Sequence, residues 1–368
     1  MARVLFISKP IAPPWHDGSK NLVRDVTAHL TRAEPTVLTT PGAPPIGPRV
    51  KMEPIYRDSG GFAPGLLANA RVMERLLKGD PHDIWNFFFA PNMASSTAAR
   101  LAKATRRAMG WKGMVVQTVA SAPREFRGVS SLIFGNRVVA LSEWTRASLV
   151  GAGLSSKDIS VIPPCAAAPR EVLPEDRALL RKELDLGAGP LVVYPGDYET
   201  SHGAETVARA IPLVLRAVPE ARFVFACRPK TKEAESARQE IVELVGKDAI
   251  YTRHVGELKD ITALLAEAKV IAFPVDDLYG KVDLPLVLLE ALALKTPLVL
   301  ARGGPLEAIS SAHFVEPSDH AALASKVIAL LQGTGVRDMI DAGRALYDTK
   351  FSPKVVAAAY DDLYDRKR

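Results

Sequence analysis

Short runs of β-branched and aromatic residues alternate with longer segments of helical periodicity along the whole chain. Strands are predicted at 3–8, 36–39, 84–89, 114–118 and 137–141 in the first half, and at 191–194, 222–227, 250–254, 270–273 and 298–301 in the second. Helices are predicted between them, at 21–31, 68–78, 94–109, 143–152, 205–218, 234–245, 258–267, 286–294 and 320–332. Parallel strands joined by crossover helices have this order. The pattern therefore predicts an α/β fold of two Rossmann-like, doubly wound halves.

Both periodicities fail around residues 163–170, where proline and alanine are frequent. A chain of 368 residues is long enough for about two domains. We therefore predict an N-terminal domain at 1–165 and a C-terminal domain at 166–350, which opens with a helix at 174–184. A last amphipathic helix within 351–368 is expected to pack across both domains.

The formal charge of +6 suits polyanionic small molecules, an anionic membrane surface or nucleic acid without choosing among them. The chain has no zinc-finger, helix-turn-helix or RNA-recognition pattern, which argues against nucleic acid as a partner. Its two cysteines, Cys165 and Cys227, are too few for a disulfide framework. No apolar run approaches the ~18 residues of a membrane span, so we expect a soluble, cytoplasmic protein. The acidic pairs 276–277 and 361–362 are expected to be solvated, and no metal site is expected.

Ligands of open parallel sheets bind beyond the carboxyl ends of the strands, so the loops that follow strands are candidate sites. The first such loop, 9–20, contains Gly18 just before a helix start, which favours close approach of an anion. It carries neither the dinucleotide fingerprint nor the P-loop pattern, which argues against a dehydrogenase and an NTPase. An ordinary capped helix behind a proline-rich loop is the alternative.

Two loops of the second half have similar positions. Gly196 and Gly203 bracket a loop after a predicted strand, where the backbone could come close to a phosphate or hydroxyl. Arg228, Lys230 and Lys232 follow the next strand, where they form either a phosphate clamp or a solvated charged turn.

The segment 273–307 is the most informative part of the chain. Its predicted helix at 286–294 is apolar except for Glu290. Burying a carboxylate costs several kcal/mol unless it has a partner, and a carboxylate can accept two sugar hydroxyls at once. Glu290 is therefore either a ligand for sugar hydroxyls or half of a structural ion pair.

Several motifs in this order resemble the retaining glycosyltransferases of family 4, the glycosyl transferases of group 1. The donor-site region of that family is similar to Leu-Pro-Leu-Val-Leu-Leu-Glu-Ala-Leu-Ala at 284–293, to Pro-Leu-Val-Leu-Ala at 297–301 and to the Gly303–Gly304 turn with Glu307. Weaker similarities lie at 138–145, 161–164, 193–203 and 254–256. The resemblance implies a GT-B fold, in which two Rossmann-like domains face a cleft.

The sequence departs from this family at three places. The position eight residues before Glu290, where the family usually has a carboxylate, is Val282, with Asp283 beside it. Asp197 and His202 occupy the loop in which the family has an arginine and a lysine for the departing diphosphate. The stretch 117–121 also lacks the histidine that many members have there.

These departures determine the catalytic candidates. Positive charge at the diphosphate must come from elsewhere, so Lys281 and Arg228 are assigned as catalytic together with Asp283. The donor-binding candidates that the resemblance implies are Gly18, Gly196, His202, Lys230, His254, Gly256, Glu290, Gly303, Gly304 and Glu307. On the acceptor side the candidates are His16, Asp17 and Ser121.

The function that follows is transfer of a sugar from a nucleotide-sugar donor to a glycan, a lipid-linked molecule or a small molecule. The resemblance implies retention of anomeric configuration with neither metal nor further cofactor. Two alternatives remain: a catalytically degenerate protein of this fold that binds a nucleotide or glycan, and a sugar-nucleotide epimerase. Arg100, Lys103 and Arg107 share one helical face, which is either a solvated surface or a peripheral contact with the anionic inner face of a membrane.

Overall fold

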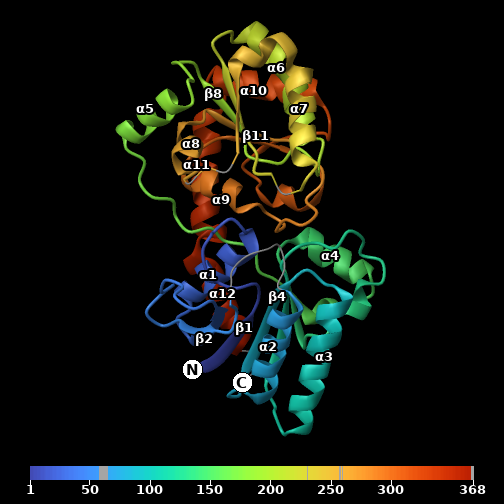
Figure 1. The fold of residues 1–368 in the computed structure, drawn as a ribbon. Helices are drawn as coiled ribbons and strands as arrows, with labels where there is room; N and C mark the ends of the chain where they lie inside the picture. Colours follow the sequence, from blue (N-terminus) through green and yellow to red (C-terminus); the bar gives the residue numbers. More distant parts are fainter. Residues whose placement is uncertain (58–64, 230, 257, 259, 366–368) are drawn as a thin grey trace. The chain divides into compact units, whose positions relative to one another are not determined.

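The computed structural model describes residues 1–57, 65–229, 231–256, 258 and 260–365. They form two compact α/β units (Figure 1). Unit 1 comprises Met1–Ala167, Tyr279–Leu286 and Lys350–Arg368, and unit 2 comprises Ala168–Leu278 and Val287–Thr349. The chain thus passes from one unit to the other two residues after the predicted boundary. The segment Tyr279–Leu286, which the sequence placed in the second domain, belongs to unit 1.

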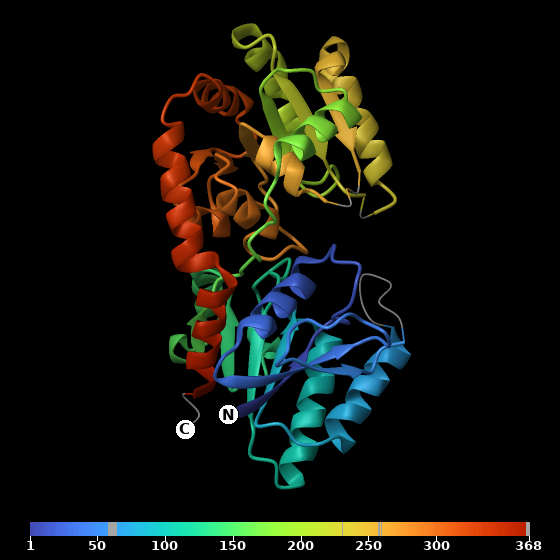
Figure 2. The same ribbon diagram turned by 90° about the vertical axis from the view of Figure 1, so that its left-hand side faces the viewer.

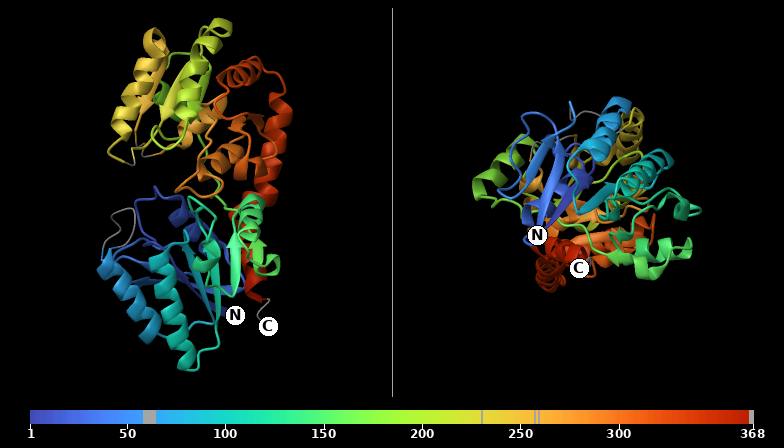
Figure 3. Two further views of the ribbon diagram at one scale, coloured as in Figure 1. Left: turned by 90° about the vertical axis from the view of Figure 1, so that its right-hand side faces the viewer. Right: turned by 90° about the horizontal axis from the view of Figure 1, so that it is seen from below.

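Unit 1 is built on a parallel sheet, sheet A, with the strand order β3-β2-β1-β4-β5-β6-β7. Its strands are β1 (Ala2–Ile7), β2 (Ala33–Thr39), β3 (Lys51–Pro54), β4 (Ile84–Phe89), β5 (Met114–Val119), β6 (Arg137–Ala140) and β7 (Ile159–Val161). Its helices are α1 (Gly18–His29), α2 (Leu66–Lys78), α3 (Met93–Ala108), α4 (Glu143–Gly151) and α12 (Pro353–Asp365). α2 and α3 pack side by side (Figure 3, left).

Unit 2 contains a second parallel sheet, sheet B, with the order β10-β9-β8-β11-β12-β13. Its strands are β8 (Leu191–Tyr194), β9 (Arg222–Ala226), β10 (Thr252–Val255), β11 (Val270–Phe273), β12 (Leu298–Ala301) and β13 (His313–Val315). Its helices are α5 (Pro174–Glu183), α6 (Gly203–Ala217), α7 (Ala234–Val245), α8 (Thr262–Glu267), α9 (Leu286–Ala293), α10 (His320–Leu331) and α11 (Val336–Leu346), and α6 packs against α7 and α10 (Figure 1).

The core follows the apolar runs that predicted the strands. The central strands β8, β11 and β12 are wholly buried, as expected where helices cover both faces of a parallel sheet. Each predicted strand corresponds to one in the structure, and β4, β8, β11 and β12 have the predicted bounds. Both doubly wound halves are therefore confirmed, whereas the expected cleft between them stays a prediction.

Three strands and one helix were not predicted. β3, β7 and β13 are short strands at the edges of the two sheets, and α11 follows α10 after a brief turn. An edge strand pairs on one side only, so it needs neither the length nor the apolar run of a central strand. Lys51–Pro54, half-exposed and polar, shows why such a strand has little signal.

The C-terminal helix α12 packs along α1 within unit 1 (Figure 2). The Asn86 side chain of β4 donates to the Tyr364 hydroxyl at 2.7 Å, inside this layer. Asp361 is 1% exposed, and its Oδ2 accepts from the Thr31 and Arg32 backbone N–H groups at 2.8 and 3.0 Å. The expectation that Asp361 is solvated is therefore wrong, because the turn after α1 offers it donors that water would otherwise supply.

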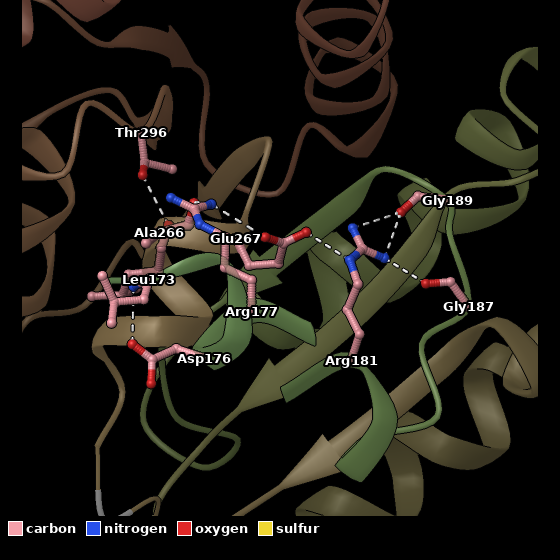
Figure 4. A network of polar contacts seen from close by, with 10 residues as sticks. Leu173, Asp176, Arg177, Arg181, Gly187, Gly189, Ala266, Glu267 and Thr296 are labelled. Carbon is pink, nitrogen blue, oxygen red and sulfur yellow. Dashed lines mark hydrogen bonds and ion pairs between the residues drawn. The ribbon is translucent and has the colours of Figure 1, made fainter. Parts of the chain in front are cut away.

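An arginine–carboxylate network fastens α5 within unit 2 (Figure 4). The Glu267 carboxylate, at the end of α8, accepts from Arg181 at 2.6 Å and from Arg177 at 3.2 Å. Arg181 also donates to the Gly187 and Gly189 carbonyl oxygens at 2.6 and 3.1 Å. The helix that opens the predicted second domain is thus held by unit 2.

The cations of α3 lie against backbone carbonyls. Arg100 donates to the Ile133 oxygen at 3.0 Å, Lys103 to the Phe134 oxygen at 2.8 Å, and Arg107 to the Gly113 oxygen at 2.7 Å. These bonds fix loops of unit 1, so the face has a structural role whatever else it does. No helix in the described part of the chain has the length and apolarity to cross a membrane.

Candidate functional site

Sheet B has a topological switch point between β8 and β11. β8 connects to β9 on one side, whereas β11 connects to β12 on the other, so the loops leaving β8 and β11 diverge. Such a point opens a crevice at the carboxyl ends of the strands, which is where open α/β sheets bind ligands. The candidate site is therefore the set of loops after β8, β11 and β12, with α9 beside them.

His202 and Asp276 join two of these loops. The Asp276 carboxylate accepts from His202 twice, from the backbone N–H at 3.0 Å and from the ring Nδ1 at 2.8 Å. The hydrogen bond and charge of Asp276 raise the pKa of His202, whose side chain is 69% exposed. Asp276 was expected to be merely solvated, but it accepts two hydrogen bonds from His202 at the start of α6.

The glycines of the loop after β8 have a packing role. A Cβ on Gly196 would lie 2.2 Å from the Tyr194 ring, and one on Gly203 would lie 2.8 Å from the Tyr194 hydroxyl. That hydroxyl donates to the Asp197 carbonyl oxygen at 2.8 Å, and Asp197 itself is fully buried. The close approach predicted for a ligand is thus made by Tyr194, although the same loop lies at the switch point.

The turn after β12 has the conformation that glycine permits. Gly303 and Gly304 have φ of +89° and +74°. The Gly303 N–H donates to the Glu307 carboxylate at 3.0 Å, so the structure brings these three predicted residues together. Glu290, on α9, is half-buried rather than enclosed in the core.

His254 lies farther along the edge, on β10. Its ring stacks on Phe225 with 4.8 Å between centroids, and its Nδ1 is 2.9 Å from the Tyr198 hydroxyl. Burial, reinforced by the charge of Arg238, lowers the pKa of His254 to about 4. Its Nε2 has no hydrogen-bond partner among the described residues. A neutral imidazole of this kind is suited to packing or to a neutral ligand group, and not to binding phosphate.

We expect this histidine to make unit 2 sensitive to acid. Its folded-state pKa is lowered, so the stability that its neutral form gives is present above the ordinary pKa near 6.5 and is lost as the pH falls toward 4. With allowance for partial exposure the loss is on the order of 1 kcal/mol. His254→Phe keeps the ring stack and removes the titration. Thermal unfolding followed by circular dichroism should show a smaller drop in midpoint between pH 7 and 4.5 for this variant than for the unchanged protein.

The remaining donor candidates of unit 2 are less well defined. Gly256 is exposed after β10, and Arg228 is half-buried after β9. Lys230 lies outside the described residues. Among the described residues no contact joins Arg228 to the switch point, so its assignment as catalytic stays a prediction.

The acceptor-side candidates lie at the corresponding edge of sheet A. Asp17 caps α1, where its carboxylate accepts from the Ser19 N–H at 2.9 Å and pairs with Lys9 at 2.5 Å. His16 before it is exposed, and Ser121 after β5 is half-buried. Their role in binding an acceptor stays a prediction.

Lys281 and Asp283 belong to unit 1, as does Gly18, whereas Arg228 belongs to unit 2. Asp283 is 2% exposed and accepts from the Ser142 hydroxyl at 2.6 Å, and burial raises the pKa of Asp283. Val282 packs against Gly18, where a Cβ would lie 3.4 Å from its methyl group. The three predicted catalytic residues therefore do not form one cluster within either unit.

Sequence reasoning missed two residues of the edge, Asp276 and Tyr198. Asp276 follows β11 closely, and its position after a strand was the signal that could have identified it. Tyr198 lies in the loop from which only Gly196, Gly203, Asp197 and His202 were considered. Among the described residues no three His, Cys, Asp or Glu side chains gather as a metal site, and metal independence stays a prediction.

Comparison with known proteins shows similarity to one family model and to several solved structures. Residues 189–333 match the family model of glycosyl transferases group 1. No curated protein sequence matches the chain. Two solved structures similar over nearly the whole chain are HepE from Anabaena in complex with UDP-glucose (15% identity, 100% of both chains, TM-score 0.75) and sucrose-phosphate synthase from Thermosynechococcus elongatus (17% identity, 100% of this chain and 99% of that one, TM-score 0.74).

A third is a glycosyltransferase from Rickettsia africae, with 17% identity over 99% of this chain and 97% of that one and a TM-score of 0.72. At sequence identities this low, the structural similarity establishes the fold alone. The resemblance stated from the sequence is confirmed: residues 189–333 carry the pattern of group 1 glycosyl transferases, and the chain has the GT-B fold of two Rossmann-like units with parallel sheets.

Proposed function

We propose that the chain is a glycosyltransferase whose nucleotide-sugar donor binds on unit 2, at the carboxyl edge of sheet B. The observation that carries the proposal is the switch point between β8 and β11, occupied by the His202–Asp276 pair, within the region that matches group 1 glycosyl transferases. HepE binds UDP-glucose on the same fold, which supports a nucleoside diphosphate sugar as the donor class.

The chemistry that this edge can supply is electrostatic. Loss of the nucleoside diphosphate develops negative charge on the leaving oxygen, and a preorganised cation lowers the barrier. His202 offers its imidazolium there, at the N-terminus of the 15-residue helix α6. Glu290 would accept the ribose hydroxyls, and the Gly303–Gly304 turn with Glu307 would contact the sugar or phosphate.

The finer parts of the proposal are retention of configuration, independence of metal, and a glycan, lipid-linked or small-molecule acceptor. The resemblance at 284–307 supports the first two. Peripheral binding to an anionic membrane is tested by sedimentation with anionic vesicles. Because the α3 cations are engaged with carbonyl oxygens, we expect the protein to stay in the supernatant.

We expect His202→Ala to weaken nucleoside diphosphate binding about tenfold and bare nucleoside binding hardly at all, because only the diphosphate presents charge. The pKa of His202 is raised, so its cation is present at low pH and is lost as the pH rises through this raised pKa. Affinity for the diphosphate should therefore fall with rising pH in the unchanged protein and stay flatter in the variant. Titration calorimetry at several pH values measures both. Glu240→Gln, at an exposed position on α7, controls for a general change of charge. Equal losses for diphosphate and nucleoside would contradict the assignment.

The function itself is tested by release of nucleoside diphosphate from a panel of nucleotide-sugars, with and without sugar, glycan and lipid-linked acceptors. Release that requires an acceptor is the predicted result. Binding of a nucleotide-sugar with no turnover would instead indicate a degenerate binding protein. Conversion of the donor to its epimer without any acceptor would indicate a sugar-nucleotide epimerase.

A further inference from the structure

The segment Tyr279–Leu286 is attached to unit 1 by three different loops. The Asp283 carboxylate accepts from Ser142, the N-cap of α4. Val282 packs on Gly18, the first residue of α1. The Arg124 guanidinium, in the loop after β5, lies over the Tyr279 ring at 4.5 Å from its centroid. The segment is therefore held at its start and in its middle.

The Asp283–Ser142 bond is the strongest of these attachments. Both residues are buried, with 2% and 3% exposure, and the oxygens are 2.6 Å apart. Ser142 uses the same hydroxyl oxygen to accept from the Thr145 N–H at 3.1 Å, so its hydrogen is left to donate to Asp283. Removing either the Asp283 carboxylate or the Ser142 hydroxyl leaves the other buried group without this hydrogen bond, which is unfavourable in a site that water does not reach.

The burial of Asp283 has a consequence for its role. A carboxylate committed to a helix N-cap and almost completely enclosed cannot also contact a sugar. The segment that it fixes ends at Leu286, where α9 begins, and α9 carries Glu290.

We propose that Asp283 is a positioning residue, which through Ser142 fixes the segment Tyr279–Leu286 and thereby the start of α9. This role adds to the proposed function, and only its kinetic test rests on that function. The carboxylate takes part by accepting the hydrogen bond of the Ser142 hydroxyl, so an amide oxygen in the same place can replace it. A carboxylate that contacts the substrate would not tolerate replacement by an amide.

The direct test is amide hydrogen exchange of the full chain, which needs no substrate. Asp283→Ala and Ser142→Ala are expected to speed exchange in peptides covering 279–286 by about tenfold, and Asp283→Asn to leave it near the original rate. Asn92→Ala is the matched control, since Asn92 caps α3 through the Ser95 N–H at 2.9 Å without touching this segment. It should speed exchange at the start of α3 only. Unchanged exchange at 279–286 in both alanine variants would overturn the proposal, and Ser142→Ala decides if Asp283→Ala fails to fold.

The kinetic arm separates positioning from contact with substrate. Asp283→Asn should keep kcat and donor KM close to those of the unchanged enzyme, and Asp283→Ala should raise the donor KM. Loss of kcat in Asp283→Asn, with exchange at 279–286 unchanged, would show that the carboxylate acts on the substrate and overturn the proposal. If the unchanged protein has no transferase activity, the proposed function fails, while the exchange experiment still decides whether Asp283 holds the segment.

Discussion

Replacing Glu290 by glutamine is expected to lower donor affinity by about 1.5–3 kcal/mol, the range of a hydrogen bond to a charged group. That corresponds to roughly 10- to 150-fold in Kd. The amide keeps the size of the side chain but has one acceptor oxygen and no charge, so it can hold one ribose hydroxyl where the carboxylate holds two. Glu290 is half-buried on an otherwise apolar helix, so the fold should tolerate the change.

Titration calorimetry with the nucleoside diphosphate and with the nucleoside measures this loss. Both ligands carry the ribose, so both should weaken alike, in contrast to the effect of His202→Ala. Glu240→Gln, at an exposed position on α7, is the control for charge in the same unit. Unchanged affinity in a folded Glu290→Gln variant would remove Glu290 from the site.

Asp361→Ala is expected to destabilise unit 1 by about 3 kcal/mol, because it removes a buried carboxylate that accepts three hydrogen bonds. The lost acceptor serves the Thr31 and Arg32 N–H groups at 2.8 and 3.0 Å and the Thr31 hydroxyl at 3.1 Å. Asp361→Asn keeps an acceptor oxygen and should cost less. The neighbouring Asp362 pairs with Arg32 at the surface, where an ion pair contributes about 0–1 kcal/mol.

The chain offers a specific probe for this measurement. All four tryptophans, Trp15, Trp85, Trp111 and Trp144, lie in unit 1. Urea unfolding followed by tryptophan fluorescence therefore reports unit 1 alone. Asp361→Ala should shift the midpoint strongly, and Asp362→Ala only slightly. Similar shifts in the two variants would show that burial of Asp361 contributes little.

How far the sequence predicts the fold depends on whether an element lies inside a sheet or at its edge. Central strands such as β8 and β11 must bury both faces, so their apolar runs are unbroken and were predicted with the correct bounds. The unpredicted strands β3, β7 and β13 are all edge strands, and the edge strand β10 begins two residues later than predicted. The turn after β12 was predicted correctly from its two glycines, since Gly303 and Gly304 both have positive φ.

The candidate site was predicted less well because its contacts are long-range. The His202–Asp276 bond joins residues 74 apart in sequence, and the Ser142–Asp283 bond joins residues 141 apart. The periodicity of helices and strands in the sequence does not indicate such long-range pairs. Position after a strand identified Gly196 and Gly203, and the family resemblance implied His202 and Glu307, but neither could show that Tyr194 fills the space beside Gly196. Nor could the sequence show that Asp283 belongs to unit 1.

The central claim, that a nucleotide binds at the carboxyl edge of sheet B, is tested most directly by hydrogen exchange of the full chain with and without saturating UDP, GDP or ADP. At least one of these nucleotides is expected to slow exchange in peptides covering 196–203, 274–278, 286–293 and 303–307. Peptides from the opposite edge of the sheet should exchange as before. No protection by any of the three, or protection confined to unit 1, would contradict the claim.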